Sequence, residues 1–236
     1  MRQIVFDLET TGFRFEEGHR IVEIGGVEMV RGAVTGRSFH AYVNPERDMP
    51  EGAFQVHGLS EKFLKDFPVF ADDRVAKAFV DFVGDAELIA HNGVAFDVPF
   101  INAELQNAGR PTLQNEIVDT LLLARRKFPG SPASLDALCA RFSIDTSQRK
   151  RDGHGALLDS RLLATVYIEL TGGLQAGLDF AEAAEGTVEA AMRGERRALR
   201  ARPKPLAPLR TAEEAEAHRK FIEAELGPKS LWASRA

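Results

Sequence analysis

Two carboxylates lie two residues apart near the start of the chain. Asp7 and Glu9 follow the apolar run Ile4-Val5-Phe6, which is typical of the start of a buried strand. Side chains alternate between the two faces of a strand, so both acids should point to one face and Leu8 to the other. Like charges this close repel each other. A divalent cation, which prefers carboxylate oxygens, is the simplest way to compensate them.

Two later stretches carry residues that could join this pair. Asp97 lies where a strand over 87–90 gives way to a helix. His154 lies in a loop rich in glycine and charge, and Asp159 lies inside the helix that follows. Each feature has an ordinary explanation when taken alone: the helix dipole favours an acid in a first helical turn, and a single histidine near a helix start is usually solvated.

A mixed sheet with helices on its faces would bring these segments together. We predict one strand beginning at Ile4 and two more over 20–30 and 36–43, joined by short turns as an antiparallel meander. Beyond them helices and strands alternate, which indicates an α/β domain with a mixed sheet. The later elements are helices over 71–83, 96–107, 120–126, 135–142 and 156–170, and strands over 87–90 and 116–119.

Size and charge restrict the classes of protein that fit. The chain has 236 residues, 44% of them hydrophobic, which suits one domain with an extension rather than two full domains. Its net charge is -5, whereas proteins that hold nucleic acid by charge alone are usually basic. A nucleic-acid partner must therefore be held through metal ions, a local patch or helper proteins.

Several features predict a cytoplasmic protein. The single cysteine, Cys139, has apolar neighbours and cannot form an internal disulfide, which fits a buried thiol in a reducing compartment. The first strand begins almost at residue 1, which leaves no room for a signal peptide. No apolar run approaches the roughly 20 residues that span a bilayer, so no membrane contact is expected.

The composition changes after residue 173. Residues 181–210 are rich in Ala, Glu, Arg and Pro and nearly free of large apolar side chains, which predicts a linker without a core. A capping-box sequence at Thr211 then starts a helix that should run to Leu226, before Gly227-Pro228. The apolar side of this terminal segment is too small to be buried alone and predicts a partner surface. Its residues are Phe221, Ile222, Leu226, Leu231 and Trp232.

The three acidic segments together resemble the three motifs of the DEDDh 3′→5′ exonucleases. The acids stand in the family's order, and the histidine lies five positions before the last of them. The matching residues are Asp7, Glu9, Asp97, His154 and Asp159. The resemblance covers roughly residues 3–170, and it is specific because all three motifs occur together. It implies a ribonuclease H-like fold with a mixed five-stranded sheet, in agreement with the α/β domain inferred above.

The resemblance also implies a chemistry. Asp7, Glu9, Asp97 and Asp159 would hold two divalent cations, Mg²⁺ or Mn²⁺, which stabilise the attacking and leaving oxygens of an in-line displacement. His154 would act as general base, since an imidazole titrates near neutral pH. The product would be a nucleoside 5′-monophosphate released from a 3′ end.

Further residues are implied to meet the terminal nucleotide. Thr10 and Thr11 would contact its sugar, and His57 and Phe96 would line the site around it. The threonines could instead only form the turn after the first strand, and Phe96 could belong to the core. Asp119 is expected to support the fold rather than to bind metal.

Within this family the chain resembles the proofreading subunits of bacterial DNA polymerase III. The likeness rests on residues 2–5, 56–58 and 134–141, on the third motif and on the length of the tail. It divides the chain into an exonuclease domain at 1–171, a linker at 172–210 and a polymerase-binding segment at 211–236. The implied partners are a DNA 3′ end and the polymerase alpha subunit, and the presence of a small accessory subunit is left open.

A short peptide at the head of the linker predicts another partner. Residues 175–180 resemble the Gln-x-x-Leu-x-Phe peptide that docks into the bacterial beta sliding clamp, with Gln175 in a polar subsite and Leu178 and Phe180 in an apolar one. A frayed helix end folded back on the domain is the alternative. Weak clamp binding combined with tethering by the polymerase would explain how an acidic protein acts on DNA.

Two other functions fit parts of the sequence. An RNA-trimming exonuclease of the same superfamily would carry the same motifs, although the clamp-like peptide and the tail argue against it. A non-catalytic bridge between clamp and polymerase would not need a complete set of metal ligands. The leading interpretation is therefore a proofreading 3′→5′ exonuclease.

Overall fold

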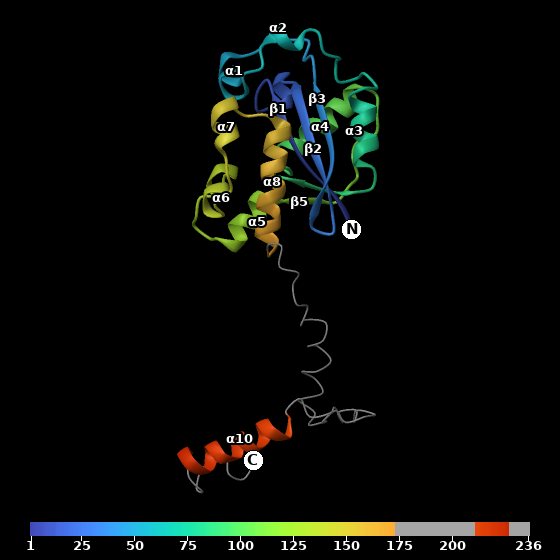
Figure 1. The fold of residues 1–236 in the computed structure, drawn as a ribbon. Helices are drawn as coiled ribbons and strands as arrows, with labels where there is room; N and C mark the ends of the chain where they lie inside the picture. The colour runs from blue at the N-terminus through green and yellow to red at the C-terminus, as the bar shows by residue number, and fades with distance from the viewer. Residues whose placement is uncertain (173–210, 227–236) are drawn as a thin grey trace. The chain divides into compact units, whose positions relative to one another are not determined.

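A computed structural model of the chain describes residues 1–172 and 211–226 (Figure 1). Its first unit is built on a mixed five-stranded sheet with the order β3-β2-β1-β4-β5. β1 is antiparallel to β2 and parallel to β4, and β4 is parallel to β5. The strands are β1 (Arg2–Thr10), β2 (Ile21–Val30), β3 (Ala33–Tyr42), β4 (Glu87–Ala90) and β5 (Ile117–Asp119). The predicted mixed sheet is confirmed.

Helices cover both faces of the sheet (Figure 1). On one face, α8 (Ala156–Thr171) packs against β1 and β2, with α5 (Thr120–Lys127) and α6 (Leu135–Arg141) beside it. α3 (Ala76–Val83) and α4 (Asp97–Asn107) pack on the other face. The remaining helices of this unit are short: η1 (Phe15–Glu17), α1 (Glu51–His57), α2 (Glu61–Leu64) and α7 (Ser147–Asp152).

The alternation of side chains along β1 divides the core into two clusters. Phe6 and Leu8 join the cluster that packs against α3 and α4. Val5 belongs to the cluster on the opposite face, under α8. Because side chains alternate, Asp7 and Glu9 share the face of Val5, and the first turn of α8 covers that face. The sequence predicted this separation of the acids from Leu8 correctly.

Most predicted boundaries agree with the structure, and three features differ. The connection from β1 to β2 spans residues 11–20 and contains η1, so it is not the short turn that we predicted. α3 begins at Ala76 rather than at 71, because residues 71–75 form turns in which Asp72 accepts a hydrogen bond from the Arg74 N–H. α1, α2 and α7 were missed because helices of four to seven residues are too short to show a clear apolar period.

Gly25 of β2 is where α8 comes closest to the sheet. A Cβ atom at this position would lie 2.1 Å from the backbone carbon of Ala156. The buried hydroxyl of Ser160 donates to the Gly25 carbonyl at 3.0 Å, which ties the helix to the strand at the same point. Glycine therefore allows the first turn of α8, which carries Asp159, to lie directly on β2.

Gly25→Ala is expected to destabilise the protein by more than the roughly 1–3 kcal/mol of ordinary overpacking, because its Cβ meets backbone that cannot rotate away. Gly26→Ala is a matched control, since a Cβ there would meet only side-chain atoms, the nearest of them in Phe82 at 3.1 Å. Urea unfolding of the two variants and the wild type measures the difference. Equal midpoints for the two variants would show that the contact between α8 and Gly25 does not matter.

The terminal helix forms as predicted and belongs to a second unit. α10 (Ala212–Phe221) continues into a π-helical turn, η2 (Ile222–Leu226). The Thr211 hydroxyl accepts from the Glu214 N–H and the Glu214 carboxylate accepts from the Thr211 N–H, so the predicted capping box is present. The Phe221 side chain is exposed, whereas Ile222 is buried.

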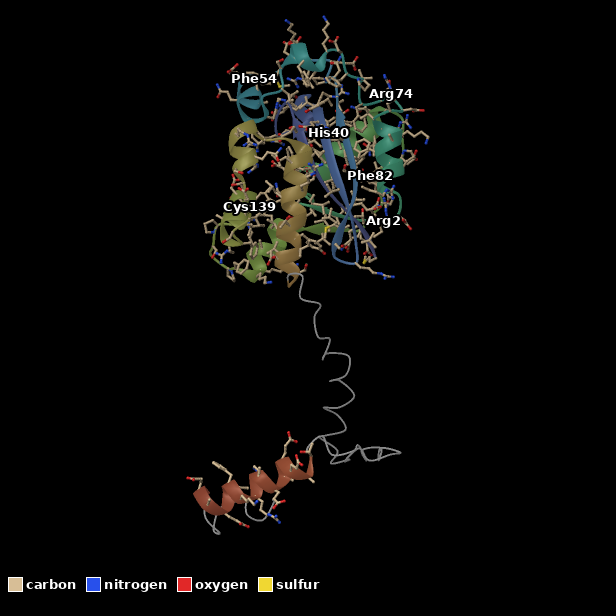
Figure 2. The ribbon with its side chains drawn as sticks, in the orientation of Figure 1. Arg2, His40, Phe54, Arg74, Phe82 and Cys139 are labelled. Carbon is tan, nitrogen blue, oxygen red and sulfur yellow. The ribbon has the colours of Figure 1, made fainter. Side chains whose placement is uncertain are left out.

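Other predictions lie outside the described residues. They concern the linker beyond residue 172, the clamp-like peptide at 175–180, and Leu231 and Trp232. Cys139 is described, and it is a fully buried free thiol in α6, as predicted (Figure 2). None of the helices within 1–172 and 211–226 has the length and apolar character that crossing a bilayer requires.

Candidate active site

Three distant segments of the chain bring four acidic residues together beside the end of β1. Asp7 and Glu9 come from the C-terminal half of β1. Asp97 is the first residue of α4, and Asp159 lies in the first turn of α8. Glu9, Asp97 and Asp159 are buried, and Asp7 is half-buried. The structure thus gathers the four acids that the sequence grouped.

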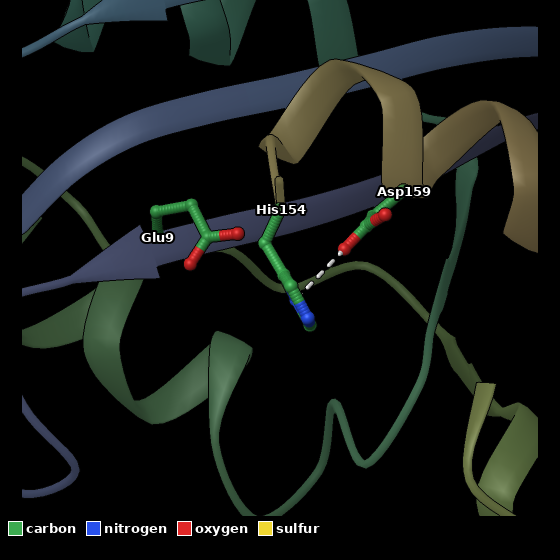
Figure 3. A group of neighbouring side chains, drawn as sticks. All are labelled: Glu9, His154 and Asp159. Carbon is green, nitrogen blue, oxygen red and sulfur yellow. Dashed lines mark ion pairs between the residues drawn. The ribbon is translucent and has the colours of Figure 1, made fainter. Parts of the chain in front are cut away.

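Glu9, His154 and Asp159 form a group that could hold a metal ion (Figure 3). One ligand atom from each residue lies within 4.8 Å of those of the other two. The His154 Nδ1 lies 3.5 Å from Asp159 Oδ2, the approach marked by the dashed line in Figure 3. The carboxylates of Glu9 and Asp159 are the oxygen donors that suit Mg²⁺ and Mn²⁺, so these two residues fit a hard divalent cation.

Asp7 and Asp97 extend this group electrostatically. Burial raises the pKa of the Asp7 carboxyl well above its usual value, and the charges of Asp97, Glu9 and Asp159 raise it further. Because Asp7 senses all three other acids, the four carboxylates act as one electrostatic cluster.

The same cause affects two other members of this cluster. Burial, assisted by the charge of Asp159, raises the pKa of Glu9 to about 8. Burial also raises the pKa of Asp97 to about 7, although backbone hydrogen bonds at Asp97 and Leu8 oppose the shift. The carboxyls therefore tend to keep protons at neutral pH. A divalent cation would displace these protons, since metal ligands must be deprotonated to bind.

Glu23 of β2 fixes the helix start that carries Asp159. Its buried carboxylate accepts a hydrogen bond from the Ala156 N–H at 3.1 Å and lies 2.7 Å from the Nε2 of His40 on β3 (Figure 2). An acid is favoured at a helix N-terminus, where backbone N–H groups lack partners. Together with Gly25, Glu23 holds α8 in place from the strand side.

Asp119 fixes the loop that leads to Asp97. Its carboxylate accepts hydrogen bonds from the backbone N–H groups of Asn92 and Val94, at 3.2 and 3.3 Å, and caps α5 by accepting from the Leu121 N–H at 2.9 Å. These bonds use the carboxylate within the fold, as the sequence prediction expected.

A cavity of about 510 Å³ opens next to Glu9. Its size falls within the roughly 300–1,000 Å³ that small-ligand sites occupy. All four residues predicted to meet a terminal nucleotide line it: Thr10, Thr11, His57 and Phe96. Most of the other lining side chains are apolar, including Phe13, Pro50, Ala53 and Val56. The cavity could therefore enclose a flat, partly apolar group whose polar end faces the acids.

Three of these residues also serve the fold. The Thr10 hydroxyl donates to the Gly12 carbonyl at 2.6 Å, and the Thr11 hydroxyl accepts from the Arg20 N–H at 3.0 Å. Both threonines therefore hold the turn after β1. Phe96 packs on Phe100, with ring centroids 5.0 Å apart, and also reaches the cavity. Both interpretations of Phe96 thus have a structural basis.

His57 lines the cavity and carries a buried ring N–H. Its Nδ1 accepts from the Leu59 N–H at 3.0 Å, so in the neutral ring the proton is on Nε2. This buried Nε2 has no hydrogen-bond partner among the described residues. Burial lowers the pKa of His57, which favours the neutral ring.

Sequence reasoning missed two features of the site. Phe13, with 88% of its surface exposed, lines the cavity next to Arg14, and an aromatic residue directly after the Thr-Thr-Gly turn was a signal that could have been used. Arg149 of α7 reaches Asp159 and His154 from a charged stretch, 147–152, that shows no motif.

Comparisons with known proteins agree with this geometry. The family model described as an exonuclease matches residues 4–167. The DNA polymerase III subunit epsilon of Rickettsia felis is 51% identical over 179 residues, which cover 74% of this chain and 76% of that protein. The protein of the same name from Escherichia coli is 42% identical over 241 residues, covering 98% of this chain and 97% of the relative.

Solved structures show the same fold. Exonuclease X in complex with 5′ overhanging duplex DNA matches with a TM-score of 0.54 and 26% identity, over 74% of this chain and 94% of that one. A structure of exonuclease I matches with a TM-score of 0.61 and 16% identity, over 72% of this chain and 40% of that one, and shares the fold alone. The chain belongs to the exonuclease family and, within it, to the DNA polymerase III epsilon subunits.

Proposed function

We propose that this chain is the proofreading 3′→5′ exonuclease subunit of a bacterial replicative DNA polymerase, and that it removes mispaired nucleotides from DNA 3′ ends. The observation that carries the proposal is the convergence of four acids and His154 beside a cavity large enough for a nucleotide. Membership of the exonuclease family supplies the reaction class. The names of the relatives support the polymerase context.

The acidic cluster would hold the metal ions of this reaction. We expect Asp7, Glu9, Asp97 and Asp159 to bind two divalent cations, Mg²⁺ or Mn²⁺. Burial is the main cause of their raised pKa values, and the charges of neighbouring acids add to it at Asp7 and Glu9. When bound, such a pair supplies charge stabilisation to an in-line phosphoryl displacement and lowers the pKa of a bound water.

His154 is placed to move the proton. Its side chain is 40% exposed and lies beside Asp159, so the ring can reach a water molecule at the edge of the cluster. His154 takes one proton from the attacking water as the water oxygen bonds to the terminal phosphorus. The bond from phosphorus to the 3′ oxygen of the preceding nucleotide breaks, and that oxygen takes a proton from solvent. The products are a nucleoside 5′-monophosphate and a strand with a new 3′ hydroxyl.

The cavity next to Glu9 would hold the nucleotide that is removed. Phe96 and the apolar lining residues give its base a surface to stack on, and stacking on aromatic side chains does not depend on base identity. His57 would contact the nucleotide from the lining of the same cavity. Thr10 and Thr11 would meet the sugar chiefly through their backbone, since their hydroxyls already hold the turn.

The test compares DNA and RNA strands of one sequence, each carrying a 3′ label, with Mg²⁺ present. We expect nucleoside 5′-monophosphates to be released faster from DNA than from RNA, and faster from a mispaired than from a paired primer end, because an unpaired end enters the cavity without the cost of opening a base pair. Faster release from RNA would favour the RNA-trimming alternative. If neither strand releases a mononucleotide, both the DNA exonuclease and the RNA-trimming exonuclease are contradicted.

We also propose that the part of the chain beyond α8 binds the replication machinery. The peptide Gln175–Phe180 is suited to the groove of the beta sliding clamp, and the 211–236 segment to the polymerase alpha subunit. The exposed Phe221 on the capped α10 helix supports a partner surface in that segment. A small accessory subunit would be a further partner of the catalytic unit.

Replacing Gln175, Leu178 and Phe180 together by Ala is expected to weaken binding to purified clamp at least roughly tenfold, because two apolar anchors worth about 1.5–3 kcal/mol each when buried are lost. Release of nucleotides from free oligonucleotides should not change. Surface plasmon resonance measures the first and the labelled-strand assay the second. A truncation after residue 210 is the control: it should lose the alpha subunit and keep the clamp. Unchanged clamp affinity of the triple variant would refute the docking peptide.

A further inference from the structure

Arg149 of α7 occupies the centre of the candidate active site. Its Nε lies 2.7 Å from Asp159 Oδ1, and its Nη2 lies 2.9 Å from Asp159 Oδ2. The guanidinium thus faces both oxygens of one carboxylate in a two-pronged ion pair, of which the Nη2 contact is a hydrogen bond. Its Nη1 pairs with Asp136 of α6, and only 9% of the side chain is exposed.

The same guanidinium also reaches His154. Arg149 Nη2 lies 2.8 Å from His154 Nδ1. A guanidinium has only hydrogen-bond donors, so Nδ1 must be the acceptor and carries no proton. In the neutral ring the proton is then on Nε2, and the one free electron pair of the imidazole is used by Arg149. The nearby approach of Nδ1 to Asp159 Oδ2, at 3.5 Å, is therefore not a hydrogen bond.

This arrangement is incompatible with the chemistry proposed for the same residues. A general base needs a free electron pair, and a cation ligand needs a free oxygen. Arg149 uses the electron pair of His154 and faces both oxygens of Asp159. Arg149 must leave His154 before this residue can take a proton, and its positive charge beside Asp159 opposes a cation there.

We propose that Arg149 is an internal counter-ion that competes with the divalent cation for Asp159, and that its release on cation binding frees His154. The inference rests on the proposed function. It couples the assembly of the metal site to the availability of the general base, so that the base becomes free only when the site is loaded.

The local structure allows this movement. α7 has only six residues, and its N-cap makes no side-chain hydrogen bond. The helix ends at Gly153, whose φ of 84° lies in the region that glycine adopts without strain. Asp136, whose side chain is 68% exposed, can remain paired with Arg149 Nη1 after Asp159 is released. The arginine then loses one of its two acidic partners and keeps the other.

Cation binding measures the competition directly. Mn²⁺ binding to the full chain is followed by calorimetry in the wild type and in Arg149→Met, which keeps an unbranched apolar stem and removes the charged guanidinium. We expect the variant to bind Mn²⁺ roughly tenfold more tightly, which corresponds to about 1.4 kcal/mol. Arg74→Met is the control, because Arg74 also faces both carboxylate oxygens of an aspartate, Asp72. It lies near α3, on the other side of the view from α7 (Figures 1 and 2). This control should bind Mn²⁺ as the wild type does.

A second readout uses the wild-type protein, so it does not depend on the folding of any variant. The Nε of Arg149 is buried, so its N–H should exchange slowly with water in the metal-free wild type. Saturation with Mg²⁺ is expected to accelerate this exchange by at least tenfold as seen by ¹⁵N NMR, and to leave the Nε–H of Arg74 unchanged. A merely structural arginine would keep its protection when Mg²⁺ binds.

The outcomes separate this inference from the proposed function. Equal Mn²⁺ affinity of wild type and Arg149→Met, or an Arg149 Nε–H that stays protected at Mg²⁺ saturation, would overturn the inference alone. Absence of cation binding in both proteins would overturn the proposed function together with it.

Discussion

Asp7→Asn is expected to abolish the release of nucleotides from a DNA 3′ end. The loss should exceed the roughly 100-fold that mutation of an outer-shell partner of a metal can cost, because Asp7 would itself be a ligand. Asp7 senses Glu9, Asp97 and Asp159 together, so its carboxylate lies at the electrostatic centre of the cluster. An amide keeps the shape of the side chain and removes the negative charge. Single-turnover cleavage of a labelled strand, measured across Mg²⁺ concentrations, tests the prediction.

Two controls separate loss of metal from loss of structure. The Asp7→Asn chain should be at least as stable as the wild type without metal, since the substitution removes one member of a crowded group of negative charges, and it should lose the rise in melting temperature that Mg²⁺ causes. His154→Gln should slow cleavage by roughly 10²–10⁴-fold, the usual contribution of a general base, and still respond to Mg²⁺. Wild-type cleavage by Asp7→Asn would remove the acidic cluster from the mechanism.

The first motif could be interpreted from sequence because strand parity is a local rule. A single apolar run fixes which residues of β1 enter the core, and Asp7 and Glu9 then have to share the other face. Asp97 and Asp159 required the family resemblance, because nothing local says that the starts of α4 and α8 meet at β1. The contacts that place these helix starts come from residues whose types are unremarkable in sequence, such as Gly25 and Glu23.

Arg149 shows where sequence reasoning stops. It lies in a charged stretch that looks solvated, and its partners Asp136 and Asp159 are separated from it by 13 and 10 residues. α7 is too short for a periodic signal, so neither its presence nor the side that Arg149 occupies could be inferred. Only the folded arrangement reveals that a positive charge lies among the acids.

The catalytic cluster also makes the metal-free protein sensitive to pH, and its stability is expected to fall as the pH rises from about 5 to about 8. The pKa of Glu9 is raised from 4.5 to about 8 and that of Asp97 from 3.8 to about 7, chiefly by burial. In this window the folded chain therefore binds more protons than the unfolded chain. Unfolding releases protons, so higher pH favours unfolding. Each such carboxyl contributes about 1.4 kcal/mol per pH unit while the two states differ by a full proton.

Urea unfolding in EDTA and in saturating Mg²⁺, at pH values from 5.5 to 8.5, isolates this effect. Burial lowers the pKa of His57 and of His91, and each contributes stability that rises with pH, the opposite sign, in both conditions. The difference between EDTA and Mg²⁺ therefore reports the carboxyls, since a bound cation keeps them ionised in the folded state. This difference in the free energy of unfolding should grow with pH. Glu9→Gln should reduce its slope against pH by up to the equivalent of one proton, about 1.4 kcal/mol per pH unit. A difference that is the same at every pH would mean that these carboxyls are already ionised in the metal-free folded protein, which would contradict the raised pKa values.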